Sequence, residues 1–194
     1  MIREVIEAMR PFRPDTVLLV VANPVDLLTS IAKEMSRLPP SQVIGTGTTL
    51  DTYRLRGMVA SRASVSLSAV DAFVMGRQGE DQVLAWSSAT IGAVQIADVQ
   101  MLSGLDRTRI ELICKHRSQS TIRGKGSAPF GIASVAADFH IQKQYRCCLS
   151  MPAVVGRKGI LSSVPLSLND KEEATVTTLG KPLKESVELI QRDW

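Results

Sequence analysis

The turn in "VMGRQGEDQ", residues 74–82, holds the first group of side chains that could do chemistry. It reads as the end of a strand followed by a tight, charged turn bounded by glycines, and such turns often carry functional groups. The central side chain, Gln78, forms hydrogen bonds but does not exchange protons near neutral pH. The stretch alone fits three interpretations: an active site, an active site that has lost its proton-transfer group, and an ordinary loop.

A second group lies in "LDTYRLR", residues 50–56, where an aspartate precedes an arginine by three positions. On a helix, positions i and i+3 share a face, so Asp51 and Arg54 can point into one pocket. A guanidinium makes two parallel hydrogen bonds to a carboxylate and thereby fixes its orientation. The alternative is a surface ion pair worth about 0.3–0.5 kcal/mol. Arg56 fits that alternative better, because it is expected to point elsewhere on the helix.

The third group follows "TVLLVVANP", residues 16–24, a run of branched residues bounded by proline. The run predicts a strand buried on both faces. Asn23 comes at its carboxyl end, where open α/β sheets bind ligands, although an ordinary Asn-Pro turn is the alternative. Asp26 is expected to cap the helix that follows.

The cysteines and histidines offer little further chemistry. Cys114, Cys147 and Cys148 have no C-x-x-C spacing, which argues against a disulfide framework or a zinc site and favours a reducing, cytoplasmic compartment. The two histidines, His116 and His140, leave little material for metal binding and are expected to be ordinary, partly exposed side chains.

Composition excludes other classes of function. The 194 residues carry a formal net charge of +4, but the basic residues are scattered and only 4% of the chain is aromatic. Because nucleic-acid binders usually concentrate basic residues and interleave aromatics, no nucleic-acid partner is expected. No run reaches the roughly 18 apolar residues of a membrane helix. The first residues lack the apolar core of a secretory signal.

The elements that must position these residues alternate along the chain, which predicts an α/β layer with parallel strands through residue 76. Helices are expected at 2–10, 27–38 and 50–62, with strands at 16–24, within 42–48 and at 70–76. Downstream, the pattern predicts a helix at 107–124, a small-residue helix at 124–139, and two strands joined by "GRKG". A closing helix follows, capped by Asn169 or Asp170 and bent or interrupted at Gly180 and Pro182.

Five segments, in this order, resemble the lactate/malate dehydrogenase family: "LLVVANPVDLLTSIA", "VIGTGTTLDTYRLR", "VMGRQGEDQVLAWSSATIG", "GKGSAPFGIA" and "LSMPAVVGRKGI…VPLSLNDKEEA". "LDTYRLR" and "LNDKEEA" lean toward lactate dehydrogenase. The resemblance implies an α/β fold in which residues 1–45 are the C-terminal remnant of an NAD-binding Rossmann domain. Residues 46–194 are then the mixed α+β substrate domain, truncated by an internal deletion near 140–146.

The resemblance also implies roles for individual residues. NAD would be the cofactor and a small 2-hydroxy or 2-oxo acid the substrate. Asn23 would contact both, and Val21 and Ala22 would line the nicotinamide side. Arg54 would bind the substrate carboxylate. Asp51 would pair with the acid/base histidine that the family carries.

The sequence departs from the family pattern at that histidine, since Gln78 occupies its position. Loss of a general acid typically costs about 10²–10⁴ in rate, and Asp51, left without an imidazolium, could repel an anionic substrate. The 194 residues hold no G-x-G-x-x-G turn for the pyrophosphate, and Ala128 stands where lactate dehydrogenases often have threonine.

We therefore expect an NAD-dependent L-2-hydroxy acid oxidoreductase by ancestry that is inactive or severely impaired as this chain. The alternative is a non-catalytic, degenerate module, or a truncated gene product, that acts by binding a partner or a small anion. Family members are usually dimers or tetramers, so a homo-oligomer is expected.

Overall fold

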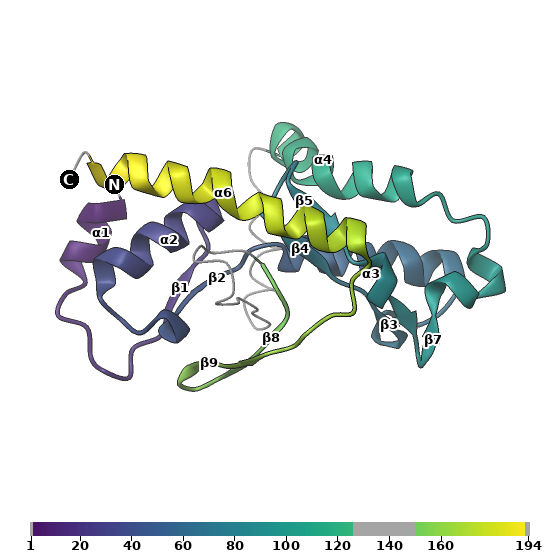
Figure 1. Ribbon diagram of the computed structural model, residues 1–194, viewed down its shortest axis with the longest axis horizontal. Helices are drawn as coiled ribbons and strands as arrows, with labels where there is room; N and C mark the ends of the chain where they lie inside the picture. The colour runs from purple at the N-terminus through teal and green to yellow at the C-terminus, as the bar shows by residue number, and fades with distance from the viewer. Residues whose placement is uncertain (1, 126–149, 193–194) are drawn as a thin grey trace.

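The computed structural model describes residues 2–125 and 150–192. Figure 1 shows an elongated molecule in which one long helix, α6 (Asp170–Arg192), runs along most of its length. At one end α6 lies over an N-terminal lobe of α1, α2, β1 and β2, and at the other it lies over the segments around β4 and β5. The chain therefore combines a small parallel unit with a larger mixed unit, as the expected α/β class requires.

The N-terminal lobe is a parallel strand pair covered by two helices. Its elements are α1 (Ile2–Ala8), β1 (Leu18–Val20), α2 (Val25–Ser36) and β2 (Val43–Gly45). β1 pairs with β2 in parallel, Leu18 opposite Val43. Ile6, Val20 and Val25 are among the side chains that form its core.

Two predictions for this lobe are wrong. The strand expected at 16–24, buried on both faces, is only three residues long, and Leu18 and Leu19 are half-buried. β2 is the one strand that pairs with it in the described part of the chain, so little holds it in an extended ladder. Asp26 does not cap α2, because the helix begins after Pro24 without a side-chain cap and Asp26 already lies in its first turn.

The rest of the molecule is built from short antiparallel strands. β3 (Val70–Asp71), β6 (Thr90–Ile91) and β7 (Val94–Gln95) form one sheet, and β4 (Val74–Gly76) pairs with β5 (Gln82–Leu84). The prediction of parallel strands through residue 76 is therefore wrong for its last strand. A short turn can join only antiparallel neighbours, since a parallel pair needs a crossover of about a dozen residues.

Two helices pack beside these strands around the largest apolar core. α3 (Thr49–Ala63) and α4 (Arg107–Lys125) enclose residues that include Leu55, Val59 and Trp86. Both helices agree with prediction. Five 3-10 turns complete the described chain: η1 (Pro40–Gln42), η2 (Leu67–Ala69), η3 (Trp86–Ser88), η4 (Ile96–Asp98) and η5 (Gln100–Leu102).

The hairpin of β8 (Ala153–Gly156) and β9 (Gly159–Ser163) confirms the two strands predicted around "GRKG". It reaches back to η1, where the approach is so close that a Cβ on Gly159 would collide with the backbone oxygen of Ser41. Gly159 also has φ +95°, a conformation that favours glycine. The hairpin is thereby held against the N-terminal lobe.

α6 begins with the predicted cap. The side chain of Asn169 accepts a hydrogen bond from the Glu172 N–H at 2.9 Å, and Glu172 accepts one from the Asn169 N–H at 3.1 Å. This reciprocal pair is a capping box. Of the predicted bend or interruption, the interruption is wrong, because α6 continues as one helix with Pro182 inside it. Packing on α2 at one end and on β4 and β5 at the other supports the helix on both sides of Pro182.

The helix predicted at 124–139 lies outside the described residues from residue 126 on, and its first two residues belong to α4. Ala128, His140, Cys147, Cys148 and the deletion near 140–146 also lie outside the described residues. Cys114 is buried and is not part of a disulfide. Among the described residues, no helix is long and apolar enough to cross a membrane, and no three His, Cys, Asp or Glu side chains are grouped to hold a metal ion.

Candidate active site

The turn between β4 and β5 is shaped by its glycines. Gly76 and Gly79 have φ values of +88° and +108°, which other residues rarely adopt. An ion pair between Arg77 and Asp81 spans the turn. The backbone between these residues is thereby held in a tight loop that presents Gln78.

This loop forms one wall of a cavity of about 620 Å³. The other walls come from the start of α2, from α3, from α4 and from α6. The lining residues are Asn23, Pro24, Val25, Asp26, Leu27, Asp51, Arg77, Gln78, Gly79, Glu80, Asp81, Lys115 and Ser186. The cavity falls within the usual range for small-molecule sites.

The cavity brings together three of the predicted site residues, Asn23, Asp51 and Gln78. They come from three separate segments, which supports the expectation that those segments converge. Val21, Ala22 and Arg54 are not among the lining residues. The predicted set is thus assembled in part.

Arg54 is turned toward Asp51 instead. Its Nη1 donates a hydrogen bond to Asp51 Oδ1 at 2.9 Å, and the residue side chains are 17% and 2% exposed. The alternative of a surface ion pair is therefore wrong for this pair. Burial raises the pKa of the Asp51 carboxyl, and the neighbouring Arg54 opposes that rise. The cation expected to bind a substrate carboxylate is thus engaged by a carboxylate of the protein.

Arg56 points elsewhere on α3, as predicted. Its Nε donates to the Ala72 backbone oxygen at 2.9 Å, and its guanidinium lies over the Phe73 ring, 4.8 Å from the centroid. It lines a separate cavity of about 280 Å³ together with Thr52 and Ser150. Arg56 takes no part in the larger cavity.

Asp26 is the site residue that sequence reasoning missed. Its carboxylate accepts a hydrogen bond from the backbone N–H of Gln78 at 2.9 Å, and the residue is only 7% exposed. Burial raises the pKa of Asp26 to about 6, while the Gln78 N–H and the charge of Arg77 act in the opposite direction. One signal was available, since Asp26 follows Asn23 by three positions in the first turn of α2.

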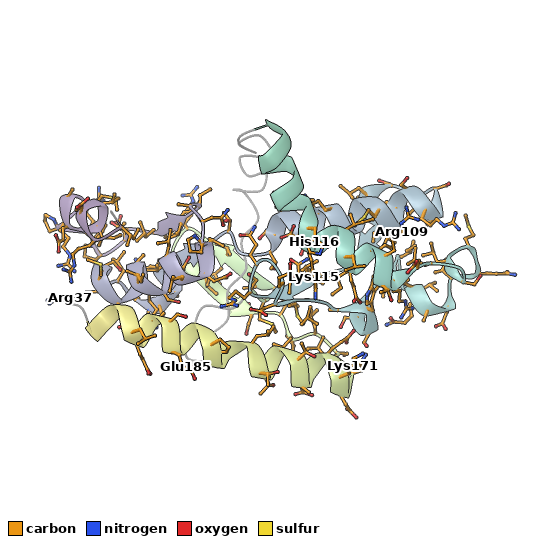
Figure 2. The ribbon with its side chains drawn as sticks, turned by 90° about the horizontal axis from the view of Figure 1, so that it is seen from above. Arg37, Arg109, Lys115, His116, Lys171 and Glu185 are labelled. Atoms are coloured by element: carbon orange, nitrogen blue, oxygen red, sulfur yellow. The ribbon has the colours of Figure 1, made fainter. Side chains whose placement is uncertain are left out.

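His116 is an exposed histidine, as predicted. It lies on α4 next to Lys115, and Figure 2 labels both side chains near the middle of the molecule. The Nδ1 atom of His116 is 3.4 Å from Oε1 of Glu80, and the two side chains are 54% and 63% exposed. His116 does not line the cavity, so it does not replace the acid/base group that Gln78 lacks.

Two family models match the chain. One is described as "lactate/malate dehydrogenase, NAD binding domain" and matches residues 1–45, and the other as "lactate/malate dehydrogenase, alpha/beta C-terminal domain" and matches residues 48–143. The chain belongs to the lactate/malate dehydrogenase family. NAD is this family's cofactor, and a 2-hydroxy or 2-oxo acid is its substrate.

Individual members of the lactate/malate dehydrogenase family agree with this assignment. The chain is 39% identical to L-lactate dehydrogenase A of Rhizopus oryzae, over 94% of this chain and 62% of that protein. It is 30% identical to L-lactate dehydrogenase of Kosmotoga olearia, over 97% of this chain and 67% of that protein. The solved structure of a lactate dehydrogenase from a Medee basin deep-sea metagenome library matches with a TM-score of 0.87 and 29% identity. The match covers 96% of this chain and 67% of that one. The chain spans less than two thirds of the Rhizopus relative.

Proposed function

We propose that this chain is an L-lactate-dehydrogenase-like protein that binds a small carboxylic acid in the cavity but turns it over poorly or not at all. In this proposal Asn23, Asp51 and Gln78 occupy the substrate and acid/base positions, Arg54 the position of the carboxylate anchor, and Val21 and Ala22 the nicotinamide side. The lactate preference rests on relatives named L-lactate dehydrogenase. Residue 45 would end the cofactor-domain segment and residue 46 begin the substrate domain.

One observation supports the loss of turnover above all others: Gln78 lines the cavity where the family resemblance places a histidine. Oxidation of a 2-hydroxy acid sends a hydride to NAD and a proton from the hydroxyl oxygen to a protein base. Histidine suits that base because its pKa is near 6.5, and glutamine cannot take the proton. A general acid or base is worth about 10²–10⁴ in rate.

Two further features are expected to weaken the binding of substrate and cofactor. Arg54 is held by Asp51, so a substrate carboxylate would compete with an internal, buried partner. The residues present fit only part of NAD, since Asn23 lines the cavity after β1 but the 194 residues hold no G-x-G-x-x-G turn for the pyrophosphate. NADH affinity weaker than millimolar is expected.

Activity measurements on the purified chain test the proposal. NADH oxidation would be followed with pyruvate and with oxaloacetate, for the wild type and for Gln78→His. We expect no rate above the protein-free control for the wild type. Gln78→His is expected to restore little, because Arg54 remains bound to Asp51. Robust wild-type turnover would overturn the proposal, and micromolar NADH binding by fluorescence would overturn the argument from the missing phosphate turn.

The raised pKa of the buried Asp26 carboxyl favours a second candidate function, a slow but active dehydrogenase. The Asp26 pKa of about 6 is close to that of a histidine. If the wild type shows turnover, Asp26→Asn should abolish it and retain NADH binding. Unchanged turnover in that variant would assign the proton transfer to another group.

Assembly and location form a separate part of the proposal. We infer a homo-oligomer, since large apolar side chains on several helices, including Val5, Leu112 and Leu189, are about half or more exposed. Light scattering at a series of protein concentrations would test this, and a monomer at all of them would refute it. Cys114 is not part of a disulfide, which fits a reducing compartment, and we propose the cytoplasm.

A further inference from the structure

Most of the charges around the cavity are paired within the protein. Asp51 is bound by Arg54 at 2.9 Å, with both side chains largely buried. Asp81 is bound by Arg77 across the loop. Each pair joins one negative and one positive group, so neither leaves a net charge for a ligand. These four residues account for most of the charge around the site.

Glu80 lies at the rim. Its side chain is 63% exposed and lies 3.4 Å from His116 on α4. Exposed charges are screened by water and salt, and their interactions are correspondingly weak. Glu80 is therefore a minor determinant of what enters the cavity.

One acid and one base remain. Asp26 lines the cavity, and its carboxylate has no ion-pair partner among the described residues. Its hydrogen-bond donor is the uncharged backbone N–H of Gln78, and the charge of Arg77 acts on it without a direct ion pair. Lys115 lines the same cavity from α4 and is half-buried. Within the described part of the chain, Lys115 has neither a hydrogen-bond partner nor an ion-pair partner. The cavity thus offers a ligand one carboxylate and one ammonium group.

We propose that the cavity binds a small zwitterion, a 2-amino acid, with its ammonium group at Asp26 and its carboxylate at Lys115. An ammonium group brings three donors and a positive charge to a carboxylate that can only accept, and hydrogen bonds between charged groups are the strong ones. A 2-hydroxy acid brings one uncharged donor to Asp26. A 2-oxo acid brings a carbonyl oxygen, which can only accept and is repelled by the ionised carboxylate.

This inference goes beyond the proposed function, because it needs neither NAD nor proton transfer. In this inference the missing histidine and the unpaired carboxylate of Asp26 both change the chemistry of the ligand that the cavity prefers. The pocket would prefer the amino analogue of the family's hydroxy and oxo acids. The preference follows from the charges that the protein leaves unpaired.

Binding should depend on pH with a defined sign. The pKa of Asp26 is raised to about 6, so the carboxylate is charged above that pH and neutral below it. The other charged residues that line the cavity are Asp51, Arg77, Glu80, Asp81 and Lys115. Helix α6, which packs against α2, contributes only the uncharged Ser186 among the described lining residues. Amino-acid binding should weaken as the pH falls through 6, and pyruvate binding should strengthen.

Ligand titrations of the folded chain, followed by amide chemical shifts, test the proposal with L-alanine, L-lactate and pyruvate at about pH 8 and about pH 5. At the higher pH L-alanine should bind about tenfold or more tightly than L-lactate, because its ammonium group makes a charge-assisted hydrogen bond to Asp26 that a hydroxyl group cannot make. Pyruvate should bind most weakly. Equal affinities for the three ligands, or no shifts with L-alanine, would overturn the proposal.

Two variants and one control locate the site. Lys115→Gln and Asp26→Asn should each weaken L-alanine binding about tenfold, and Asp26→Asn should also improve pyruvate binding, because an amide can donate to the carbonyl. Lys171→Gln is the matched control, since Lys171 is exposed on α6 and is not among the residues that line the cavity. Unchanged L-alanine binding in Lys115→Gln, with the fold verified by circular dichroism, would also overturn the proposal.

The two proposals fail separately. Turnover of lactate or pyruvate would refute the proposed function whatever L-alanine does. Absence of L-alanine binding in a folded chain that shows no turnover would refute the zwitterion site alone.

Discussion

Two aspartates on neighbouring walls of the cavity differ in what holds them. Asp26 lies in the first turn of α2 and Asp51 in the first turn of α3, and both are buried, at 7% and 1% exposure. Burial raises the pKa of each carboxyl. Asp51 is bound directly by the guanidinium of Arg54, whereas Asp26 accepts from the backbone N–H of Gln78 and feels Arg77 only through its charge.

The carboxylate of Asp51 therefore has a structural role, whereas that of Asp26 is available to a ligand. A buried ion pair that loses one partner leaves an uncompensated charge, so both members are committed to the pair. A backbone N–H offsets only part of the cost of burying a charge, and the carboxylate remains ready to lose that charge or to bind a cation. Asp51 and Arg54 are thus fixed by each other, and Asp26 is the group that can respond to a ligand or to pH.

The largest effect should come from breaking the Asp51 pair. Arg54→Met leaves the Asp51 carboxylate buried without its cation, and we expect the free energy of unfolding to fall by about 3 kcal/mol. Urea denaturation measures this change. Adding Asp51→Asn should recover much of the loss, because the stranded charge is removed. Arg62→Met, at an exposed position on the same helix, is the control and should change stability little. A loss in Arg54→Met no larger than in this control would show that Asp51 does not depend on Arg54.

A smaller change, an increase in the free energy of unfolding, is expected when Asp26 is replaced. Its folded pKa of about 6 lies above the ordinary value of 3.8, so its contribution to stability is fully present below pH 3.8 and is lost as the pH rises through 6. Asp26→Asn removes that loss and keeps an acceptor for the Gln78 N–H. The variant should be more stable than the wild type by about 2 kcal/mol near pH 8.

Urea denaturation of both proteins across pH measures the Asp26 effect. The advantage of Asp26→Asn should shrink as the pH falls through 6 toward 4. An advantage that does not vary with pH would mean that the carboxylate does not titrate in this range. Glu185→Gln, at an exposed position on α6, controls for the general effect of removing one negative charge.

Gln82 extends the comparison to a buried, uncharged polar side chain. It is 4% exposed, and neither its Nε2 nor its Oε1 atom has a hydrogen-bond partner among the described residues. Gln82→Met keeps the length of the side chain and removes the buried polar group. We expect the free energy of unfolding to rise by about 1 kcal/mol, measured by urea denaturation. A loss of stability would indicate that the amide is hydrogen-bonded.

Local patterns predicted the elements that depend on neighbours in the sequence. The capping box of α6 was anticipated from Asn169 and the acids after it, and the "GRKG" turn was anticipated from its glycines. The i, i+3 spacing of Asp51 and Arg54 correctly placed them on one face of a helix. The convergence of Asn23, Asp51 and Gln78 came from the family resemblance, because no local pattern relates residues so far apart.

The features that were missed depend on tertiary contacts. The Asp26 carboxylate reaches a residue 52 positions away, so its role could not be read from the first turn of α2. The i, i+3 spacing did not reveal whether Arg54 faces the cavity or Asp51, because that depends on how deeply both are buried. The antiparallel pairing of β4 was missed because alternation of elements was extended past a turn too short for a crossover.

The position of α6 determines how its backbone amides can exchange hydrogen with solvent. The helix packs on α2 at one end and on β4 and β5 at the other, and Ser186 lies in the cavity wall between them. Releasing its central amides for hydrogen exchange therefore requires contacts to break with two parts of the chain. A ligand that binds only the closed cavity slows that release by mass action. Exchange along α6 would then report whether the cavity is occupied.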